Sequence, residues 1–263
     1  LPEWVLPSRH HAMQITATII TLNEEANIRD CIKSVQKICD EVIVVDSLST
    51  DNTVEIAESL GAKVLKQAYL GDGPQKSFAV PYAKNDWILS LDADERLDND
   101  CIDEIRNLDL SLADITYAFR RKNFVGDKWI KAAGFYPDRV TRLYNKQTAG
   151  YLPLKAHSKV VGGSVAQLNG HILHRTYDDY RHWEQRINEL STRDAWAKYE
   201  QGKRCSEAGA APRALFALFK KLFLKRGLIQ GADGWLVAMT TMFHVYWKYM
   251  KLAELSKKNH DNE

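Results

Sequence analysis

The chain has few cysteines, and none stands in a pattern typical of a metal centre. Cys31, Cys39, Cys101 and Cys205 are its four cysteines, and they form no Cys-x-x-Cys pair. Thiols spaced in this way in a chain of 263 residues are typical of a reducing compartment, because secreted domains use paired cysteines for disulfides. We therefore expect a cytoplasmic protein.

A long apolar run is also lacking. Residues 234–247 contain no Asp, Glu, Lys or Arg, but they are fewer than the ~18–20 residues that a helix needs to span a bilayer. Residues 1–12 contain two prolines and two histidines and no apolar core of a signal peptide, so we leave them out of the fold prediction and take Met13 as a candidate start. We expect a protein that is dissolved or bound to a membrane surface.

An excess of charge is absent as well. Lys and Arg number 36 and Asp and Glu number 34, so the formal net charge is +2, which is too small to indicate nucleic acid as a partner. Hydrophobic residues make up 45% of the chain and charged residues 27%, as in ordinary globular proteins. This length accommodates one catalytic domain with an appendage.

From residue 14 onward, apolar runs typical of strands alternate with segments of helical period. Strands are predicted at 15–22, 41–46, 62–67 and 87–91, and helices at 28–38, 53–60 and 75–83. This alternation predicts βαβ crossovers in a doubly wound sheet, where ligands bind beyond the carboxyl ends of the strands. Acidic residues fall at those ends, namely Glu24 and Glu25, Asp46, and Asp92 and Asp94.

The later chain is less regular. Strands of a mixed or antiparallel part are predicted at 116–125, 139–145, 155–161 and 171–174. From residue 180 the period is helical, with breaks near 202, 209–212 and 231–234. We predict an α/β catalytic domain at residues 13–179 and a helical C-terminal subdomain at residues 180–263.

The end of the fourth strand carries an Asp-x-Asp motif, Asp92-Ala93-Asp94. Two carboxylates on one turn suit Mg²⁺ or Mn²⁺, which would bridge the oxygens of a diphosphate and offset charge on a departing nucleoside diphosphate. The alternative is that these carboxylates only cap the next helix, because short motifs often match by chance. Lys76, after a glycine-rich loop, could reach a phosphate or ribose, or could be a solvated surface lysine. Asp51 is assigned to capping the second helix.

Three motifs together resemble the family 2 glycosyltransferases of the GT-A fold over residues 14–97. They are Thr21-Leu22-Asn23-Glu24, Val44-Val45-Asp46-Ser47 with Thr50-Asp51-Asn52-Thr53, and Leu91-Asp92-Ala93-Asp94-Glu95. The resemblance implies a Rossmann-like mixed sheet flanked by helices, and inverting transfer by single displacement, with a divalent metal (Mg²⁺ or Mn²⁺) and a UDP-sugar donor. A sugar-nucleotide site would then form at the ends of the strands.

The resemblance also implies roles for individual residues. The donor site is expected to comprise Thr21, Asn23, Glu24, Asp46, Lys76 and Asp92, with Thr21 and Asp46 near the uracil and Asp92 close to both ribose and metal. Asp94 is implied as the surest metal ligand. GT-A enzymes often supply a late histidine as a further ligand, which makes His174 a candidate, although a lone histidine is more often structural.

Later segments resemble one subgroup, the bacterial lipopolysaccharide-core β-1,4-glucosyltransferases that act on heptose. They are residues 129–143, 171–174, 180–204, 223–227 and 248–252. This resemblance implies transfer of glucose or a similar hexose to a heptose of the inner core. The alternatives are another lipid-linked or capsular glycan acceptor, and a non-catalytic sugar-nucleotide-binding scaffold. A nucleotidyltransferase would have a basic, glycine-rich loop after the first strand, where this chain has Glu24 and Glu25.

An inverting displacement needs a base to take the proton of the acceptor hydroxyl. Asp138 is the candidate, because its segment resembles the one that carries the family's acidic base. The alternative is that Asp138 pairs with Arg139 or Arg142 on a loop. Related sequences often have His-Glu where this chain has His157-Ser158, so that glutamate's role cannot be transferred. This departure leaves the base open and is the one hint of a non-catalytic scaffold.

Residues 213–226 contain five basic and no acidic residues. A helical wheel places Leu215, Phe216, Leu218, Phe219, Leu222 and Phe223 on one face and Arg213, Lys220, Lys221 and Lys225 on the other. Such a helix can lie on an anionic lipid surface. Because the expected acceptor is a lipid-linked saccharide, we predict a peripheral protein on the inner face of the cytoplasmic membrane. A core-packing helix or a homo-oligomer contact would explain the pattern as well.

Overall fold

The computed structural model describes residues 14–155 and 158–258. The chain divides into two compact units, which we describe separately. The first unit comprises residues up to 121 together with residues 139–174, and the second comprises residues 122–138 and the chain from 175 onward. Among the described residues, no helix combines the length and apolar character needed to cross a membrane.

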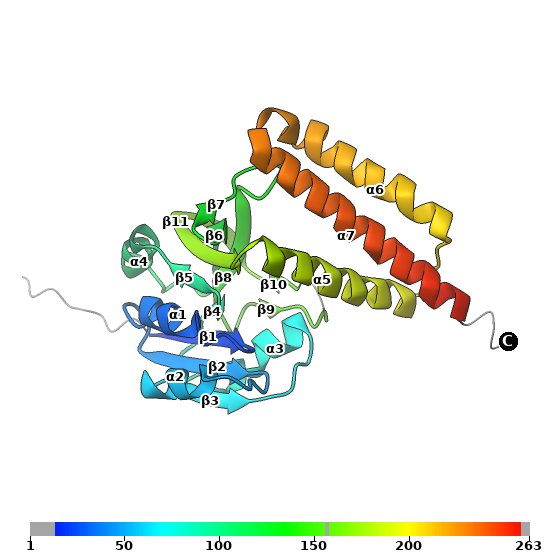
Figure 1. Ribbon diagram of the computed structural model, residues 1–263. Helices are drawn as coiled ribbons and strands as arrows, with labels where there is room; N and C mark the ends of the chain where they lie inside the picture. Colours follow the sequence, from blue (N-terminus) through cyan, green and yellow to red (C-terminus); the bar gives the residue numbers. More distant parts are fainter. Residues whose placement is uncertain (1–13, 156–157, 259–263) are drawn as a thin grey trace, which may run out of the picture. The chain divides into compact units, whose positions relative to one another are not determined.

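Strands and helices alternate in the first half of the chain, and helices dominate the last third (Figure 1). The strands are β1 (Ile15–Thr21), β2 (Glu41–Asp46), β3 (Lys63–Lys66), β4 (Trp87–Asp92), β5 (Glu95–Leu97), β6 (Ile115–Val125), β7 (Lys128–Trp129), β8 (Asp138–Asn145), β9 (Gly150–Tyr151), β10 (Val160–Val161) and β11 (Ser164–Tyr177). The α-helices are α1 (Ile28–Val35), α2 (Thr53–Ser59), α3 (Asp72–Phe78), α4 (Asn99–Arg106), α5 (Tyr180–Glu200), α6 (Ala210–Phe219) and α7 (Gly231–Lys258). Short helical segments are η1 (Val80–Tyr82), η2 (Glu207–Gly209), η3 (Lys220–Leu224) and η4 (Gly227–Ile229).

The main sheet is mixed, with the strand order β3-β2-β1-β4-β8-β6-β11-β5 and with β7 paired to β6. The strands β3, β2, β1 and β4 are parallel, whereas β8 pairs with β4, and β5 with β11, in antiparallel fashion. The predicted fold class, a mixed sheet flanked by helices with helices at its C-terminal end, is confirmed. In this register Thr21 lies opposite Asp46, and Ile20 lies opposite Asp92.

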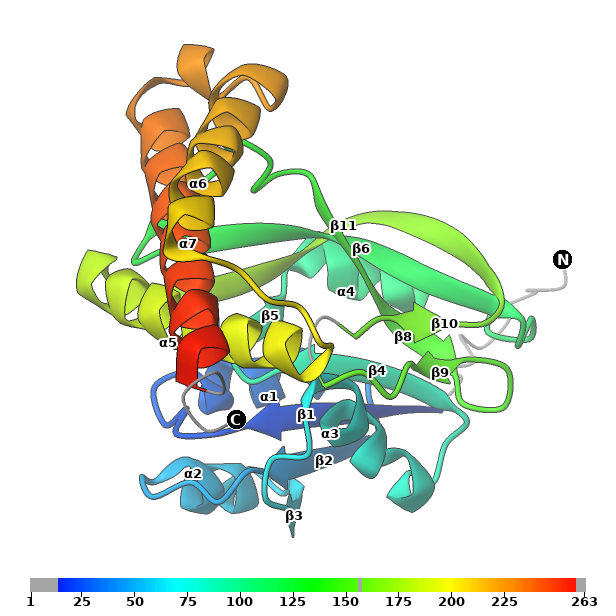
Figure 2. The ribbon, with the colours of Figure 1, turned by 90° about the vertical axis from the view of Figure 1, so that its right-hand side faces the viewer.

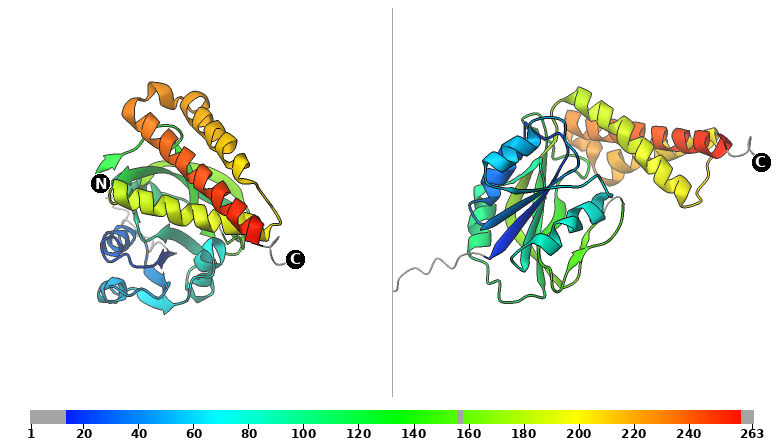
Figure 3. Two further views of the ribbon diagram at one scale, coloured as in Figure 1. Left: turned by 45° about the vertical axis from the view of Figure 1, so that its right-hand side comes forward. Right: turned by 90° about the horizontal axis from the view of Figure 1, so that it is seen from below.

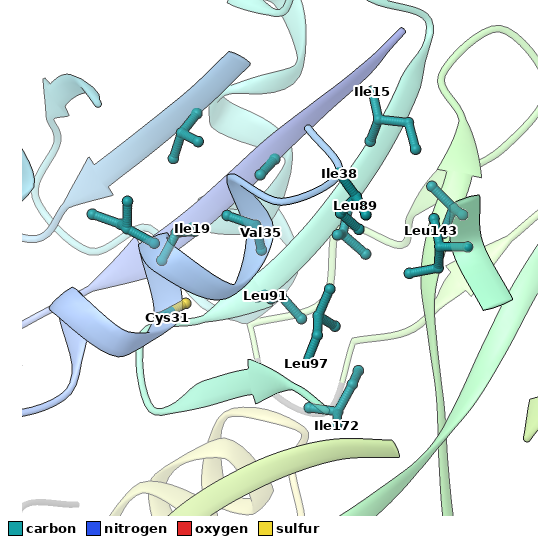
Figure 4. Close-up of a cluster of buried hydrophobic side chains, with 14 of the residues drawn as sticks. Ile15, Ile19, Cys31, Val35, Ile38, Leu89, Leu91, Leu97, Leu143 and Ile172 are labelled. Carbon is teal, nitrogen blue, oxygen red and sulfur yellow. The ribbon is translucent and has the colours of Figure 1, made fainter. Parts of the chain in front are cut away.

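Both faces of the parallel strands are covered by helices, which explains why these strands are almost wholly apolar (Figure 3). The larger core packs one face against α1, α2 and α4, and the smaller core packs the other face against α3 and η1. Helix α1 forms because its buried residues recur at helical spacing, as Ile28, Cys31, Ile32 and Val35. These side chains meet those of Ile15, Ile19, Leu89 and Leu91 from the strands (Figure 4).

Helix α3 differs from its prediction, since it begins at Asp72 and ends at Phe78 rather than covering 75–83. Pro74 lies in its first turn, where a missing N–H costs nothing. Pro81 cannot donate to the helical ladder, so the chain leaves the α-helix and forms η1 instead. The strand predicted at 155–161 is formed only at Val160–Val161 among the described residues.

In the second unit, α7 packs along α5 and α6 (Figure 2). Its small core joins the segment at 122–138 to the helices, through Val125, Ile130, Ala132, Ala133, Trp183 and Val237. Gln230 Oε1 accepts a hydrogen bond from the Ala133 amide at 2.6 Å, and Lys128 pairs with Asp233. Helix α5 begins at Tyr180, but the domain boundary between residues 179 and 180 stays a prediction.

Candidate active site

The carboxyl ends of β1 and β2 meet at one edge of the sheet, beside α3 (Figure 1). The loops that follow these strands are joined by reciprocal hydrogen bonds. The amide of Asn23, which has a left-handed φ of 54°, donates to Ser49 Oγ at 2.9 Å, and Asn23 Oδ1 accepts from the Thr50 amide at 2.8 Å. The Glu24 amide donates to Thr53 Oγ1 at 2.8 Å. Asn23 and Glu24 therefore hold the two loops together.

Asp46 is buried and folds its own loop. Its Oδ2 accepts from the amides of Leu48 and Ser49, both at 3.0 Å, and its Oδ1 accepts from Ser49 Oγ at 2.5 Å. Opposite Asp46, the buried hydroxyl of Thr21 has no hydrogen-bond partner among the described residues. A buried polar atom without a partner is costly, so the Thr21 hydroxyl is suited to a ligand atom.

Asp51 lies two residues before α2, and Asn52 rather than Asp51 is the N-cap residue of this helix. Its Oδ1 accepts from the Thr53 amide at 3.0 Å, and Thr53 is the first residue of α2. Its Oδ2 accepts from the Glu25 amide at 3.1 Å. The carboxylate of Asp51 thus accepts from the amide of the first residue of α2 and joins the two loops.

Helix α3 carries Lys76, and a close backbone contact positions this helix. A Cβ on Gly73 would lie 1.9 Å from the carbonyl oxygen of Leu152, so only glycine fits there. The Gly73 amide donates to the Leu154 carbonyl at 2.9 Å. Lys76 is buried, and its Nζ lies 2.9 Å from Asp72 Oδ1 and 3.1 Å from Asp92 Oδ1. Lys76 is therefore not a solvated surface lysine.

Asp92 and Glu95 bracket the turn between β4 and β5, and two arginines bind them. Arg142 Nη2 donates to Asp92 Oδ2 at 2.9 Å and to Glu95 Oε1 at 2.6 Å. Arg121 Nη1 donates to Glu95 Oε1 at 2.9 Å. The Glu95 side chain has no exposed surface, so this carboxylate exchanges hydration for two guanidinium groups.

The charges of this network shift its pKa values. Burial raises the pKa of the Asp92 carboxyl, but Lys76 and Arg142 outweigh burial and hold that pKa well below its usual range. Burial likewise raises the pKa of Glu95, and Arg142 lowers it to a net value below the usual range. For Lys76, burial lowers the pKa, but Asp92 more than offsets this and leaves it raised. All three groups are charged at neutral pH.

Asp94, the second carboxylate of the motif, faces His174. His174 Nε2 lies 3.1 Å from Asp94 Oδ2, and the two side chains are brought together because His174 on β11 lies opposite Glu95 on β5. Burial lowers the pKa of His174, but the Asp94 carboxylate outweighs burial and raises it. The other oxygen, Asp94 Oδ1, is buried without a hydrogen-bond partner among the described residues.

This donor set fits a divalent cation in part. Asp94 Oδ1 is a free carboxylate oxygen, and imidazole nitrogen and carboxylate oxygen are both ligands of Mn²⁺. Within residues 14–155 and 158–258, no cluster of three or more His, Cys, Asp or Glu side chains is arranged around a metal position. A cation bound by Asp94 and His174 would therefore need further ligands from a diphosphate or water.

Asp138 lies in the second unit, at the start of β8. Asn123 Nδ2 donates to Asp138 Oδ2 at 3.2 Å and to the Phe135 carbonyl at 3.1 Å. Arg142, one of the two partners considered for Asp138, binds Asp92 and Glu95 instead. Of the His157-Ser158 pair, His157 lies outside the described residues, and the Ser158 amide donates to Asp72 Oδ2 at 2.7 Å.

Three residues of this network were not predicted as site residues: Glu95, Arg121 and Arg142. Glu95 directly follows the Asp-x-Asp motif, and this position was the available signal. Arg121 lies in β6 and Arg142 in β8, far along the chain from Glu95. Nothing in the sequence around either arginine identifies Glu95 as its partner. The roles of the predicted donor and metal residues stay predictions.

The fold defines an α/β protein with polar side chains gathered at the carboxyl ends of its parallel strands. Comparison with known proteins gives its family. Residues 16–168 match the sequence model of Glycosyl transferase family 2, and the chain belongs to this family. The protein is a glycosyltransferase.

Relatives of this chain include two bacterial glycosyltransferases. The chain is 38% identical over 256 residues to a glycosyltransferase of Rickettsia bellii (strain RML369-C), covering 92% of this chain and 87% of that protein. It is 28% identical over 262 residues to the lipopolysaccharide core biosynthesis glycosyltransferase LpsC of Rhizobium meliloti (strain 1021), covering 92% and 93%. Among solved structures it is similar to TarS of S. aureus, with a TM-score of 0.47 and 18% identity, covering 68% of this chain and 40% of that one.

Proposed function

We propose that this glycosyltransferase transfers a hexose, glucose in the first instance, from a UDP-sugar to a heptose of the lipopolysaccharide inner core, with inversion. The observation that carries the donor assignment is the unpartnered, buried Asp94 Oδ1 beside His174, at the edge of the sheet where Asp92 and Lys76 also lie. The acceptor assignment is supported by the similarity to LpsC, whose name refers to the lipopolysaccharide core.

In this proposal Asp94 and His174 hold the divalent cation. The cation would offset the negative charge that develops on the departing diphosphate. Lys76 keeps its positive charge because Asp92 raises its pKa, and it contributes a second cation to the same edge. The arginine pair at Asp92 and Glu95 keeps the turn in place before the donor binds, so that no reorganisation is needed during transfer.

Thr21, Asn23, Glu24 and Asp46 are proposed to bind the nucleoside. The hydroxyl of Thr21 is available for a hydrogen bond to the base, since it has no partner among the described residues. Asn23 and Glu24 shape the loops that would flank the base. Asp46 holds its loop and retains lone pairs for an N–H of uracil.

Asp138 is proposed as the general base. It would take the proton of the acceptor hydroxyl as that oxygen forms its bond to the anomeric carbon, and the bond from this carbon to the diphosphate oxygen would break. The amide group of Asn123 donates to Asp138 Oδ2, which orients the carboxylate that would take the proton.

Calorimetric titration with UDP and UDP-glucose, with and without Mn²⁺, tests the donor assignment. Wild type is expected to bind both ligands in a metal-dependent way, and Asp94→Ala is expected to lose this dependence. Absence of binding under all metal conditions would refute the UDP-sugar donor. Turnover with heptose-containing core acceptors then tests the acceptor, and hydrolysis of the donor without acceptor would count against a non-catalytic scaffold.

A further inference from the structure

The amphipathic segment at residues 213–226, in the second unit, buries only part of its apolar surface. Ala214 and Leu222 are its buried residues, and α6 packs along α7 (Figure 2). Ala217 and Leu218 are half-buried, and the other apolar residues of the segment are exposed. A core-packing role therefore accounts for one side of the segment only.

The uncovered side is strongly apolar. Leu215, Phe216, Phe219 and Phe223 are all exposed, and we call them the exposed apolar face. Counted from Leu215, the other three follow after one, four and eight residues, a spacing that places all four on one side of a helix. The rings of Phe219 and Phe223 stack with centroids 4.8 Å apart, so they form one continuous apolar surface.

The exposure continues where the chain turns from α6 into α7. Leu224, Leu228 and Ile229 are exposed there, Ile229 to 78%, and we call them the tip. Trp235, in the first turns of α7, is exposed as well. Single exposed apolar residues are ordinary, but a group of large ones on one element marks an interaction surface.

The same stretch carries unbalanced positive charge. Lys220, Lys225 and Arg226 are exposed, and among the described residues no carboxylate forms an ion pair with any of them. Residues 213–226 contain no acidic residue. Lys221 points inward instead, and its Nζ donates to the Ala133 carbonyl at 2.8 Å. The exposed cations therefore lie beside the exposed apolar side chains without local neutralisation.

We propose that the exposed apolar face and the tip dock on the surface of an anionic lipid bilayer. Apolar and aromatic side chains would enter the boundary between headgroups and acyl chains, and the flanking cations would pair with anionic headgroups. Each such cation strengthens binding by about fivefold. A second copy of the chain fits less well, because it would bring the same positive charges to the contact.

This surface would hold the enzyme beside a lipid-linked acceptor. Binding to lipid requires no sugar transfer, so it can be tested apart from the proposed function of the site. Failure of lipid binding would leave the donor and acceptor assignments untouched, and failure of those assignments would leave the docking surface standing.

The test is co-sedimentation of the full chain with vesicles of phosphatidylethanolamine containing about 30% phosphatidylglycerol, compared with phosphatidylcholine vesicles. Wild type is expected to bind the anionic vesicles at least about tenfold more strongly. Phe216→Ser with Phe223→Ser, and separately Lys220→Glu with Lys225→Glu, are each expected to weaken this binding by about tenfold or more.

Matched controls lie in the first unit. Leu112→Ser with Val165→Ser removes apolar side chains of similar exposure, and Lys33→Glu with Lys37→Glu reverses two exposed charges on and after α1. Both are expected to bind vesicles as wild type does, and thermal unfolding establishes that every variant is folded. Equal binding by wild type and the docking-surface variants would overturn the proposal. The proposal would also be overturned if the wild type did not bind lipid but formed dimers, and if Phe216→Ser with Phe223→Ser dissociated those dimers.

Discussion

Arg142 and Glu95 form an ion pair that is almost wholly removed from water. Their Nη2 and Oε1 atoms are 2.6 Å apart, and the side chains are 5% and 0% exposed. The pair joins β8 to the first residue of β5, directly after the Asp-x-Asp motif. Because Arg142 also binds Asp92, it determines how both ends of that turn are held.

Replacing Glu95 by glutamine should destabilise the protein by about 3 kcal/mol or more, because it leaves buried guanidinium charge without its carboxylate. Urea unfolding at neutral pH measures this loss. Glu58→Gln, an exposed carboxylate in α2, is the matched control and should change the free energy of unfolding by less than about 0.5 kcal/mol. If both substitutions changed the free energy of unfolding equally, the buried Arg142–Glu95 pair would not stabilise the protein more than an exposed carboxylate does.

The stability of the protein should fall in acid. Asp92 and Glu95 have pKa values held below their usual range in the folded state, so the unfolded chain takes up protons first as the pH drops. Their contribution is therefore complete above the unfolded pKa values of about 4 and is lost as the pH falls toward the folded ones. Urea unfolding between about pH 6 and pH 3 should show a shallower decline for Glu95→Gln than for wild type. Parallel curves would contradict the assignment.

Replacing His174 by glutamine should weaken Mn²⁺ binding in the presence of UDP by about tenfold or more, because it removes one of two proposed protein ligands. Paramagnetic resonance of free Mn²⁺ measures the affinity directly. His171→Gln is the control, since His171 lies on the same strand and its Nδ1 lies 3.3 Å from Asp98 at the start of α4. If both variants bind Mn²⁺ like wild type, His174 is not a ligand.

Replacing Asp138 by asparagine should lower kcat by about 10²- to 10⁴-fold, the usual contribution of a general base, and should leave the affinity for the UDP-sugar unchanged. Steady-state transfer to a heptose acceptor, together with donor calorimetry, separates these effects. Asp127→Asn, at a fully exposed position of the same unit, should retain full activity. If the Asp138→Asn variant kept the wild-type kcat, Asp138 would not be the general base.

The sequence predicted the parallel half of the sheet closely, because there the information is local. Apolar runs bounded by turn residues define β1, β2 and β4 within a residue or so, and helical spacing defines α1. The helix predicted at 75–83 differs from α3 in its bounds for a local reason too, since Pro74 lies in the first turn of α3 and Pro81 in η1. Prolines are tolerated in a first helical turn but not beyond it.

The residues that follow the strands came together as expected. Parallel neighbours end at the same edge of a sheet, so Thr21, Asp46 and Asp92 had to lie near one another once β1, β2 and β4 were adjacent. The partners of these residues were not predictable in the same way. Lys76 was assigned to a phosphate or to solvent, and its burial between Asp72 and Asp92 depends on how the loop after Leu152 packs on Gly73.

The sequence by itself therefore determined the family, the alternation of strands and helices from β1 to β4, and the strand ends at which the polar residues gather, because these follow from short-range spacing. Tertiary structure alone decided that Arg142 binds Glu95 rather than Asp138, that His174 meets Asp94, and that Phe216 and Phe223 stay exposed. Each of these outcomes depends on which segments, distant in the chain, become neighbours. A charged or apolar side chain has many possible partners along a sequence. The fold decides which partner lies beside it, and a buried charge must be paired with that partner to offset its lost hydration.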